Sequence, residues 1–346
     1  QDPPSIDPEL SEAAQKLFDL DAPNRLVPNK EYIINVQGRK SKRNGEEDAA
    51  PNPLFEYVDP AVFEDRPTYR TFAALLDNYQ PNVCLVEDDT KSEREEAYAF
   101  LRAAMKTPVL RFCYSFCRSR LLLAEQQQAA TESQATPVTG SSSNNTNKPK
   151  DSNFDTEEDF IRLLYKIWFR SYSRSRGCET IDNSNGDSAS STAANTNGNG
   201  GQKRERVFGS SGFEHVFVGE IREGKVIGFH NWIQIHMQEK LGNVDYRGFV
   251  DKGSTAANAN ARVLTYNLQW MGAEKYLGTS FIGVSPEFEL ALYTMMFLVG
   301  KKDNIIRLDL GTTTNTTEQD RVIQLDVKCF KTKGKVGSCY VESMLT

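Results

Sequence analysis

The sequence predicts an α+β protein in which a helical N-terminal lobe, residues 8–181, packs on a mainly antiparallel β-rich region, residues 204–346. Two observations predict this class. The first third of the chain repeats apolar residues at the spacing of amphipathic helices. From about residue 207, short β-prone runs alternate with turn residues instead. We expect a single domain, preceded by a flexible tail over residues 1–7.

Apolar spacing and capping residues place the expected helices. They cover residues 8–20, 68–79, 92–106, 108–125, 157–168, 232–241 and 286–299. Thr107 and Pro108 give one helix a cap and a proline in its first turn, and Ser285 with Pro286 does the same for the last helix. Thr156 opens the fifth helix in a pattern typical of a capping box.

The β-rich region is predicted from short apolar or alternating runs. The expected strands cover residues 216–221, 225–229, 261–271, 279–284, 305–310, 321–331 and 335–341. Glu223 and Gly224 offer a turn between the first two strands. A hairpin at this turn would bring residues 215 and 230 close together.

Two tracts interrupt the pattern. Residues 126–153 and 182–203 are rich in Ser, Asn, Thr, Gln and Ala, and such compositions bury too little apolar surface to fold alone. We expect both to be disordered inserts within one domain, because the entropy of closing a loop rises only slowly with its length.

Composition limits the classes of function. The chain has 41 Lys and Arg against 47 Asp and Glu, a net charge of −6, which argues against a broad electrostatic grip on nucleic acid. An enzyme of this charge that acts on nucleic acid would need a local basic site. No apolar run approaches ~18 residues, so no membrane-spanning helix is expected.

The six cysteines contain no C-x-x-C pair, which argues against a zinc ribbon. Cys113 and Cys117 lie on one face of an expected helix and are interpreted as buried thiols. Cys329 and Cys339 flank an expected hairpin turn and are candidate cross-strand neighbours.

Two glycosylation sequons occur, at Asn144 and Asn315. Together with the even cysteine count they favour a secreted glycoprotein with disulfide bonds. A cytoplasmic or nuclear protein is the alternative.

All three histidines of the chain, His215, His230 and His236, lie between residues 209 and 248, beside Glu214 and Glu220. Histidine is the side chain whose ordinary pKa lies nearest neutrality, so this stretch is the predicted chemical centre. His236 falls within the expected helix after residue 231, where a packing role is favoured.

Five sequence motifs carry a family resemblance. They are GFEHVFVGE at 212–220, GFHNW at 228–232, FIGVSPEFE at 281–289, and the N-terminal segments LFDLDAPNRL and PTYRTFAALLDNY. On these motifs the chain resembles the EndoU family, the poly(U)-preferring endoribonucleases, whose catalytic fold is shared by the coronavirus uridylate-specific endoribonuclease. The resemblance covers nearly the whole chain except the two polar tracts.

The resemblance implies cleavage of single-stranded RNA at uridines, stimulated by Mn²⁺, with 2′,3′-cyclic phosphate and 5′-hydroxyl products. It implies catalytic roles for His215, His230 and Lys275, with a supporting acidic pair of Glu214 and Glu220.

The resemblance also assigns uracil binding to Ser338 and Tyr340, by a short C-terminal motif. Cys339 stands between them and leaves the chemistry of the pocket open. The metal ligands are not identified, and the partner implied is a single-stranded RNA containing uridine. The oligomeric state is left open, with a monomer favoured.

The chemistry supports this assignment independently. RNA cleavage through the 2′-hydroxyl needs a base, an acid and a cation for the charge that develops on the phosphate. We expect His230 to be the base, because the N-terminus of the following helix would lower its pKa. His215 is the expected acid, since Glu214 beside it would favour the protonated form. Lys275 supplies the cation, and no metal is logically required.

Two other functions remain open. The first is an RNA-binding protein on the same fold with little or no cleavage activity. The second is a metal-dependent hydrolase that uses His215, His230, Glu214 and Glu220 as ligands, which predicts a linear phosphate product and complete loss of activity in chelator.

Overall fold

The computed structural model describes residues 5–40, 48–134, 154–174, 209–250, 262–311 and 322–343. The tract 182–203 and both sequon asparagines lie outside these residues, as does most of the tract 126–153. The first residues of that tract do not form a separate insert, because the preceding helix continues to Gln134. Gln and Ala are good helix formers, so a low-complexity composition here extends the helix.

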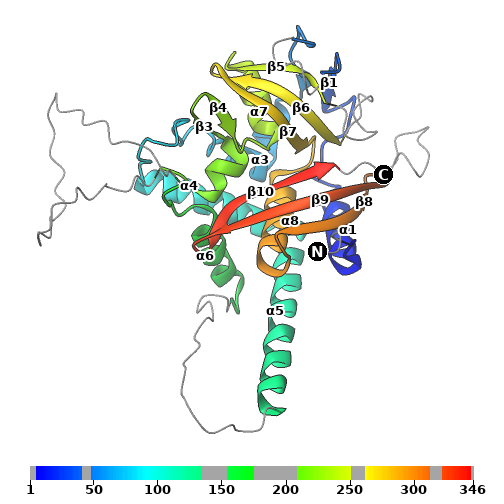
Figure 1. Cartoon of the computed structure of the whole chain (residues 1–346), viewed down its shortest axis with the longest axis vertical. Helices are drawn as coiled ribbons and strands as arrows, with labels where there is room; N and C mark the ends of the chain where they lie inside the picture. The colour runs from blue at the N-terminus through cyan, green and yellow to red at the C-terminus, as the bar shows by residue number, and fades with distance from the viewer. Residues whose placement is uncertain are drawn as a thin grey trace, which may run out of the picture.

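Eight α-helices are described (Figure 1). They are α1 (Pro8–Leu20), α2 (Ala61–Asp65), α3 (Pro67–Ala73), α4 (Lys91–Met105), α5 (Pro108–Gln134), α6 (Glu157–Trp168), α7 (Trp232–Lys240) and α8 (Pro286–Val299). The helix expected over residues 68–79 ends early, at Ala73, because the chain then tightens into successive turns, with Leu75 and Leu76 each donating to the carbonyl three residues back. Every other predicted helix is present.

The predicted caps are formed. The Thr156 hydroxyl accepts from the backbone N–H of Asp159, whose carboxylate accepts from the Thr156 N–H in return. The Ser285 hydroxyl accepts from the N–H of Phe288 at 3.2 Å and so begins α8. These bonds satisfy N–H groups that a helix leaves unpaired at its start.

The strands form three sheets. A two-stranded sheet pairs β1 (Tyr32–Ile34) with β2 (Phe55–Val58). A five-stranded sheet has the order β3-β4-β7-β6-β5, with β3 (Glu220–Arg222), β4 (Lys225–Ile227), β5 (Val244–Phe249), β6 (Val263–Trp270) and β7 (Ala273–Phe281). A three-stranded sheet has the order β10-β9-β8, with β8 (Asp303–Asp309), β9 (Val322–Thr332) and β10 (Lys335–Ser343).

All these pairings are antiparallel except β4 with β7, which confirms the α+β prediction. The sequence reading missed β1, β2 and β5, and placed the start of β7 several residues too late. It was wrong about residues 216–218, which belong to a π-helical turn, η1 (Glu214–Val218), instead of a strand. Gly219 ends this turn with φ 96°, a conformation that favours glycine.

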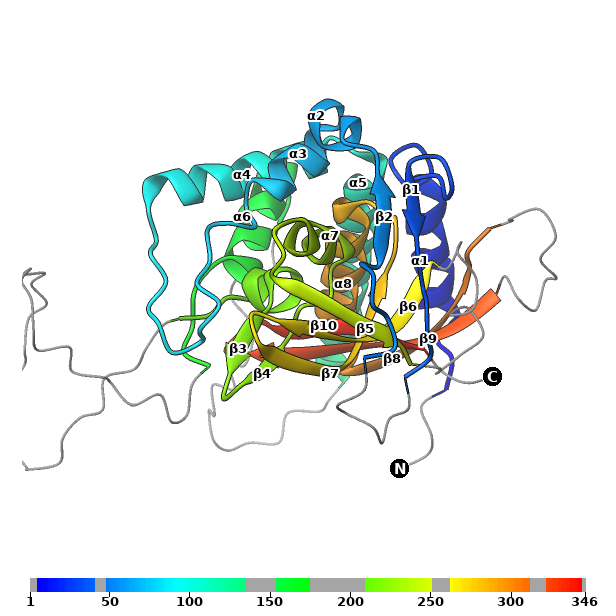
Figure 2. The same cartoon turned by 90° about the horizontal axis from the view of Figure 1, so that it is seen from above.

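Helix α8 is the centre of the core. Every residue from Pro286 to Phe297 is buried, so the helix is covered on all sides. It lies between the β9–β10 face of the three-stranded sheet and helices α1 and α5 (Figure 2). The indole N–H of Trp168 in α6 donates to Thr294 at 2.9 Å and ties a further helix to it.

Two strands of the three-stranded sheet are also joined covalently. The disulfide between Cys329 and Cys339 connects directly paired residues of β9 and β10, which confirms that the two cysteines are cross-strand neighbours. Cys84 is disulfide-bonded too, whereas Cys113 and Cys117 are buried free thiols, again as predicted. No helix of the described residues is long and apolar enough to span a membrane.

An aromatic cluster surrounds Phe213, the residue that precedes the π-helical turn. Its fully buried ring packs on rings from α3, α4 and the segment after α6, at centroid distances between 4.7 and 6.2 Å. The cluster comprises Phe72, Phe100, Phe169, Phe213 and Phe217. It anchors the start of the turn that carries Glu214 and His215 to the helical lobe.

We expect Phe213→Ala to lower the free energy of unfolding by about 3–5 kcal/mol, because it leaves a cavity among rigid rings. Urea denaturation measures this change. Tyr57→Ala, at a side chain that is 42% exposed, is the matched control and should cost less than about 1 kcal/mol. Equal losses in the two variants would contradict the anchoring role of Phe213.

Candidate active site

The first feature of the site is the close contact between the backbones of its two histidine segments. The carbonyl of His215 in η1 accepts from the N–H of Phe229 at 3.0 Å, and that of Val216 accepts from the N–H of His230 at 2.8 Å. Gly228 makes this approach possible. Its φ is 66°, and a Cβ on it would lie 1.6 Å from the His215 carbonyl oxygen. The predicted proximity of residues 215 and 230 is therefore confirmed, with β3 and β4 paired so that Glu220 lies opposite Ile227.

His215 is oriented by a carboxylate. Its Nδ1 lies 2.5 Å from Oε2 of Glu220, which is fully buried at the start of β3. Burial lowers the pKa of His215, and Arg174 lowers it further, whereas Glu220 opposes both. Burial alone would raise the pKa of Glu220, but His215 and Arg174 outweigh it and hold that pKa below its ordinary value. Glu220 is thus an anion that fixes the Nδ1–H tautomer and directs Nε2 outward.

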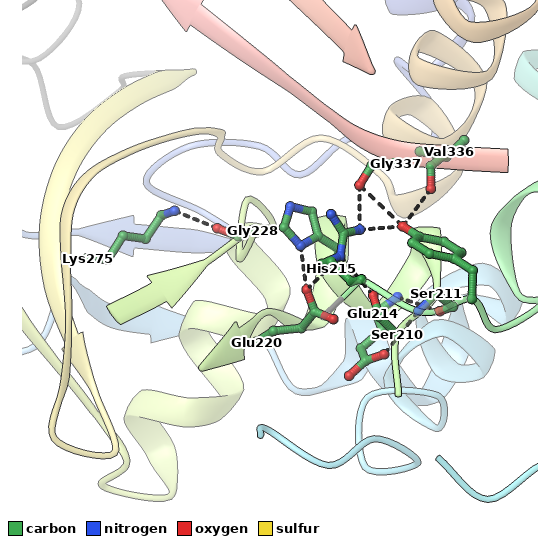
Figure 3. A network of polar contacts seen from close by, with 11 residues as sticks. Ser210, Ser211, Glu214, His215, Glu220, Gly228, Lys275, Val336 and Gly337 are labelled. Atoms are coloured by element: carbon green, nitrogen blue, oxygen red, sulfur yellow. Dashed lines mark hydrogen bonds and ion pairs between the residues drawn. The ribbon is translucent and has the colours of Figure 1, made fainter. Parts of the chain in front are cut away.

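Arg174 completes this group and was not found from the sequence. Its Nε lies 3.3 Å from Oε2 of Glu220 and donates to the Ser210 hydroxyl at 2.9 Å. Its Nη2 donates to the Tyr172 hydroxyl and to the Gly337 carbonyl in β10 (Figure 3). The guanidinium therefore links the carboxylate behind His215 to the strand that bears Ser338 and Tyr340.

His230 is held on two sides. Its Nδ1 lies 3.3 Å from the carbonyl oxygen of Thr279, which can only accept, so Nδ1 is the donor and Nε2 carries the lone pair in the neutral ring. The ring stacks on Tyr340 with centroids 4.8 Å apart and planes 10° from parallel. Burial lowers the pKa of His230 well below its ordinary value, and the charges of Lys275 and His215 add to this effect.

Lys275 reaches the same place from β7. Its Nζ donates to the carbonyl of Gly228 at 2.5 Å, two residues before His230 (Figure 3). The residue is 5% exposed, and burial lowers its pKa to about 7. Lys275, His215 and His230 therefore converge, and each has a pKa displaced toward or below neutrality by the low dielectric of the site.

Ser338 and Tyr340 lie on one face of β10, since side chains two residues apart in a strand point the same way. The stacking on His230 shows that this face is the one turned toward the histidines. Cys339 points to the opposite face, where it is fully buried in the disulfide with Cys329. The doubt about Cys339 is thus removed, because its side chain does not face the site.

Glu214 does not support His215 as the sequence reading proposed. The carboxyl is fully buried on another side of the π-helical turn and accepts from the N–H of Ser211 at 3.1 Å. Burial, with the nearby charges of Glu220 and Glu87, raises its pKa to about 10. A neutral Glu214 cannot favour the protonated form of its sequence neighbour, so the argument that made His215 the acid was wrong in its choice of partner. Glu220 holds that position.

His236 is a packing residue, as expected. It lies in α7, where its ring stacks on Phe63 and meets Phe55 edge-on. Burial lowers its pKa to about 4, so the ring is neutral at physiological pH.

The described residues offer no ready metal site. None of them form a group of three or more His, Cys, Asp or Glu side chains arranged to hold a metal ion. Glu220 is occupied by His215 and Arg174, and Glu214 is protonated. These residues therefore do not fit the Mn²⁺ that the resemblance implies.

Comparison with known proteins agrees with the fold and the motifs. A family model described as "Endoribonuclease XendoU" matches residues 9–136 and 201–341. The uridylate-specific endoribonuclease B of Danio rerio is 35% identical over 304 residues, 86% of each chain. The poly(U)-specific endoribonuclease-B of Xenopus laevis is 33% identical over 313 residues, 88% of this chain and 87% of that one.

A solved structure is similar over 99% of both chains, with a TM-score of 0.65 and 29% identity. It is described as "The structure of XendoU: a splicing independent snoRNA processing endoribonuclease". The fold is thus of the XendoU type. The chain belongs to the XendoU, or EndoU, family of endoribonucleases.

The burial of the Lys275 ammonium is expected to lower the stability of the fold. The pKa of Lys275 is about 7 in the folded protein and 10.5 when the side chain is exposed. Below about pH 7 the ammonium is charged in both the folded and the unfolded state, so folding bears the full cost of burying the charge. Between pH 7 and 10.5 the side chain is neutral in the fold, and this cost shrinks as the pH rises. Lys275→Met should raise the melting temperature by about 5 °C at pH 6, and by less at pH 9.

Thermal melts at the two pH values measure this effect. Lys91→Met, at a side chain that is 85% exposed, is the control and should show no such dependence. A Lys275→Met variant that is destabilised equally at both pH values would show that the ammonium stabilises the fold.

Proposed function

We propose that this protein is an endoribonuclease that cleaves single-stranded RNA at uridines through attack of the 2′-hydroxyl, leaving a 2′,3′-cyclic phosphate and a 5′-hydroxyl. The observation that carries the proposal is the convergence of His215, His230 and Lys275 on the Gly228 loop, with Tyr340 stacked on one of the imidazoles. Family relatives that are named for uridylate or poly(U) specificity support it.

His230 is the general base in this mechanism. Its Nε2 carries the lone pair, and its strongly lowered pKa keeps the ring neutral before the reaction. It takes the proton of the 2′-hydroxyl as that oxygen attacks the phosphorus. The sequence argument from the helix dipole reached the same role, but burial and the Lys275 charge are the larger causes here.

His215 is the general acid. Its Nδ1 is bound to the ionised Glu220, which stabilises the imidazolium more than any contact of His230 does. Its Nε2–H is then available to protonate the departing 5′ oxygen. Arg174 keeps Glu220 in place and so acts on the reaction through His215.

Lys275 places its ammonium against the non-bridging oxygens of the phosphate, where negative charge grows in the transition state. A pKa near 7 leaves the group partly neutral in the free protein, and a bound phosphate would favour the charged form. Ser338 and Tyr340 supply a hydroxyl and an aromatic face for the uracil.

Four further properties are part of the proposal. We propose that Mn²⁺ acts on RNA binding or folding, outside the proton transfers derived above. We also propose a secreted, glycosylated monomer, since the Cys329–Cys339 disulfide is typical of oxidising compartments.

The reaction is tested by the end it leaves. A DNA oligonucleotide with one ribouridine, incubated with and without Mn²⁺, should give a 2′,3′-cyclic phosphate by mass spectrometry. A 2′-deoxyuridine at the same position should not be cleaved, because it lacks the nucleophile. His215→Ala, His230→Ala and Lys275→Ala should each lower kcat by about a hundredfold or more.

Two results would contradict this reading. If the protein bound the oligonucleotide but did not cleave it at enzyme excess, it would be an RNA-binding protein on this fold. A linear phosphate, formed only with metal, would indicate the hydrolase.

The roles of the two histidines are tested by pH. Glu220→Gln removes the charge that raises the pKa of His215, so the basic limb of the kcat/KM profile should move about one unit toward lower pH. The acidic limb, which reports the base His230, should stay in place. A shift confined to the acidic limb would exchange the two roles.

A further inference from the structure

We propose that a cationic surface beside the site binds the sugar–phosphate backbone of the nucleotides next to the scissile uridine. The surface, termed the flank patch, consists of Lys166, Arg170, Lys333 and Lys335. This inference rests on the proposed function and names where the rest of the RNA lies.

The flank patch is assembled from two segments. Lys166 lies in the last turn of α6, and Arg170 follows that helix by two residues. Lys333 lies in the turn between β9 and β10, and Lys335 is the first residue of β10. Lys335 joins them, because its Nζ donates to the carbonyl of Ser171 at 3.0 Å and lies over the ring of Tyr172. Arg170 and Lys333 are both exposed.

Carboxylates do not neutralise most of the charge of the patch. Arg170, Lys333 and Lys166 lie close enough that, after burial, their charges lower the pKa of Lys335. Among the described residues, the ion pairs of the chain do not include Arg170, Lys333 or Lys335.

Lys328, further along the same strand pair, shows the contrast. Its ammonium is held by Asp303 at 2.9 Å and by Asp326 at 2.6 Å. Three members of the flank patch lack such ion pairs with the described part of the chain. Because the chain has a net charge of −6, a nuclease of this composition needs a local basic site, and the flank patch is that site.

The patch is continuous with the site. Tyr172, beneath Lys335, bonds to Arg174, which contacts Glu220 behind His215. Along β10, Lys335 is three residues before Ser338, a distance of about 10 Å in a strand. Phosphates one or two nucleotides from the bound uracil would therefore reach the patch.

A cavity adjoins the patch on the α8 side of the three-stranded sheet, opposite to Ser338 and Tyr340, so a strand of RNA would reach it by passing over the β9–β10 turn. The cavity, of about 420 Å³, is lined by the three lysines of the patch, by Lys331 and by apolar side chains that include Ile167 and Phe297. Proteins that bind single strands combine a cationic track with apolar faces for unstacked bases. Among the described residues of this lining Glu125 is the one carboxylate, so the lysines outnumber the acids there.

The test compares short and long substrates. Wild type, Lys333→Ala and Lys333→Ala/Lys335→Ala are assayed on the dinucleotide UpA, and on oligonucleotides with one uridine extended by adenosines on the 5′ or the 3′ side. The double variant should raise KM about tenfold for one extended series, with kcat unchanged and UpA cleaved as by wild type. The slope of log KM against log salt should fall by about 0.7 for each phosphate that the variant no longer neutralises.

Controls separate charge from structure. Lys333→Arg/Lys335→Arg keeps the charge and should restore KM, whereas Lys91→Ala removes an exposed charge on α4 and should change nothing. Thermal melts confirm that the variants fold.

Unchanged KM for both extended series would overturn the proposal, as would an equal loss on UpA, which would show that the lysines only support the site. Loss of binding to polyglutamate with RNA cleavage intact would assign the patch to an acidic protein partner instead. Failure of wild type to cleave any substrate would refute the proposed function itself, so the two failures are distinguishable.

Discussion

The backbone at Gly228 is the point on which the site depends. Because this residue has no Cβ, its loop can approach the His215 carbonyl closely enough for the hydrogen bonds that bring the two histidine segments together. The same residue's carbonyl receives Lys275. One backbone position thus determines the distances among all three basic groups, and any side chain here would separate them.

Burial lowers the pKa values of His215, His230 and Lys275, and it also makes their charged forms costly to the fold. Water would leave an imidazole near its ordinary pKa and a lysine fully charged, whereas the low dielectric of the site disfavours both cations. At His215 the carboxylate of Glu220 opposes this effect, whereas the charge of Arg174 adds to it. Two identical side chains are therefore given different proton affinities by what lies behind them.

Much of this arrangement could be predicted from the sequence. Long amphipathic helices such as α1, α4 and α6 were placed well, because their apolar spacing and caps are local signals. The short strands β1 and β2 were missed, since so few residues carry no periodicity. The motifs identified His215, His230 and Lys275, but their geometry required the fold.

The carboxylate that contacts His215 shows why the remaining geometry of the site could not be predicted from the sequence. Glu214 is adjacent to His215 in sequence, yet the π-helical turn directs it away and brings Glu220 to the imidazole. Arg174 lies far along the chain from both and belongs to no motif. Its role arises only because the Tyr172 segment crosses beside Ser210 and β10.

The alternation of β10 has a consequence for how specificity can change. Ser338 and Tyr340 face the histidines, while Cys339 between them is locked into the interior. The side chains proposed to contact the base and the side chain that holds the sheet together are thus interleaved but face opposite ways. Substitutions at Ser338 or Tyr340 can therefore change the proposed base contacts without disturbing the packing that keeps the strand in place.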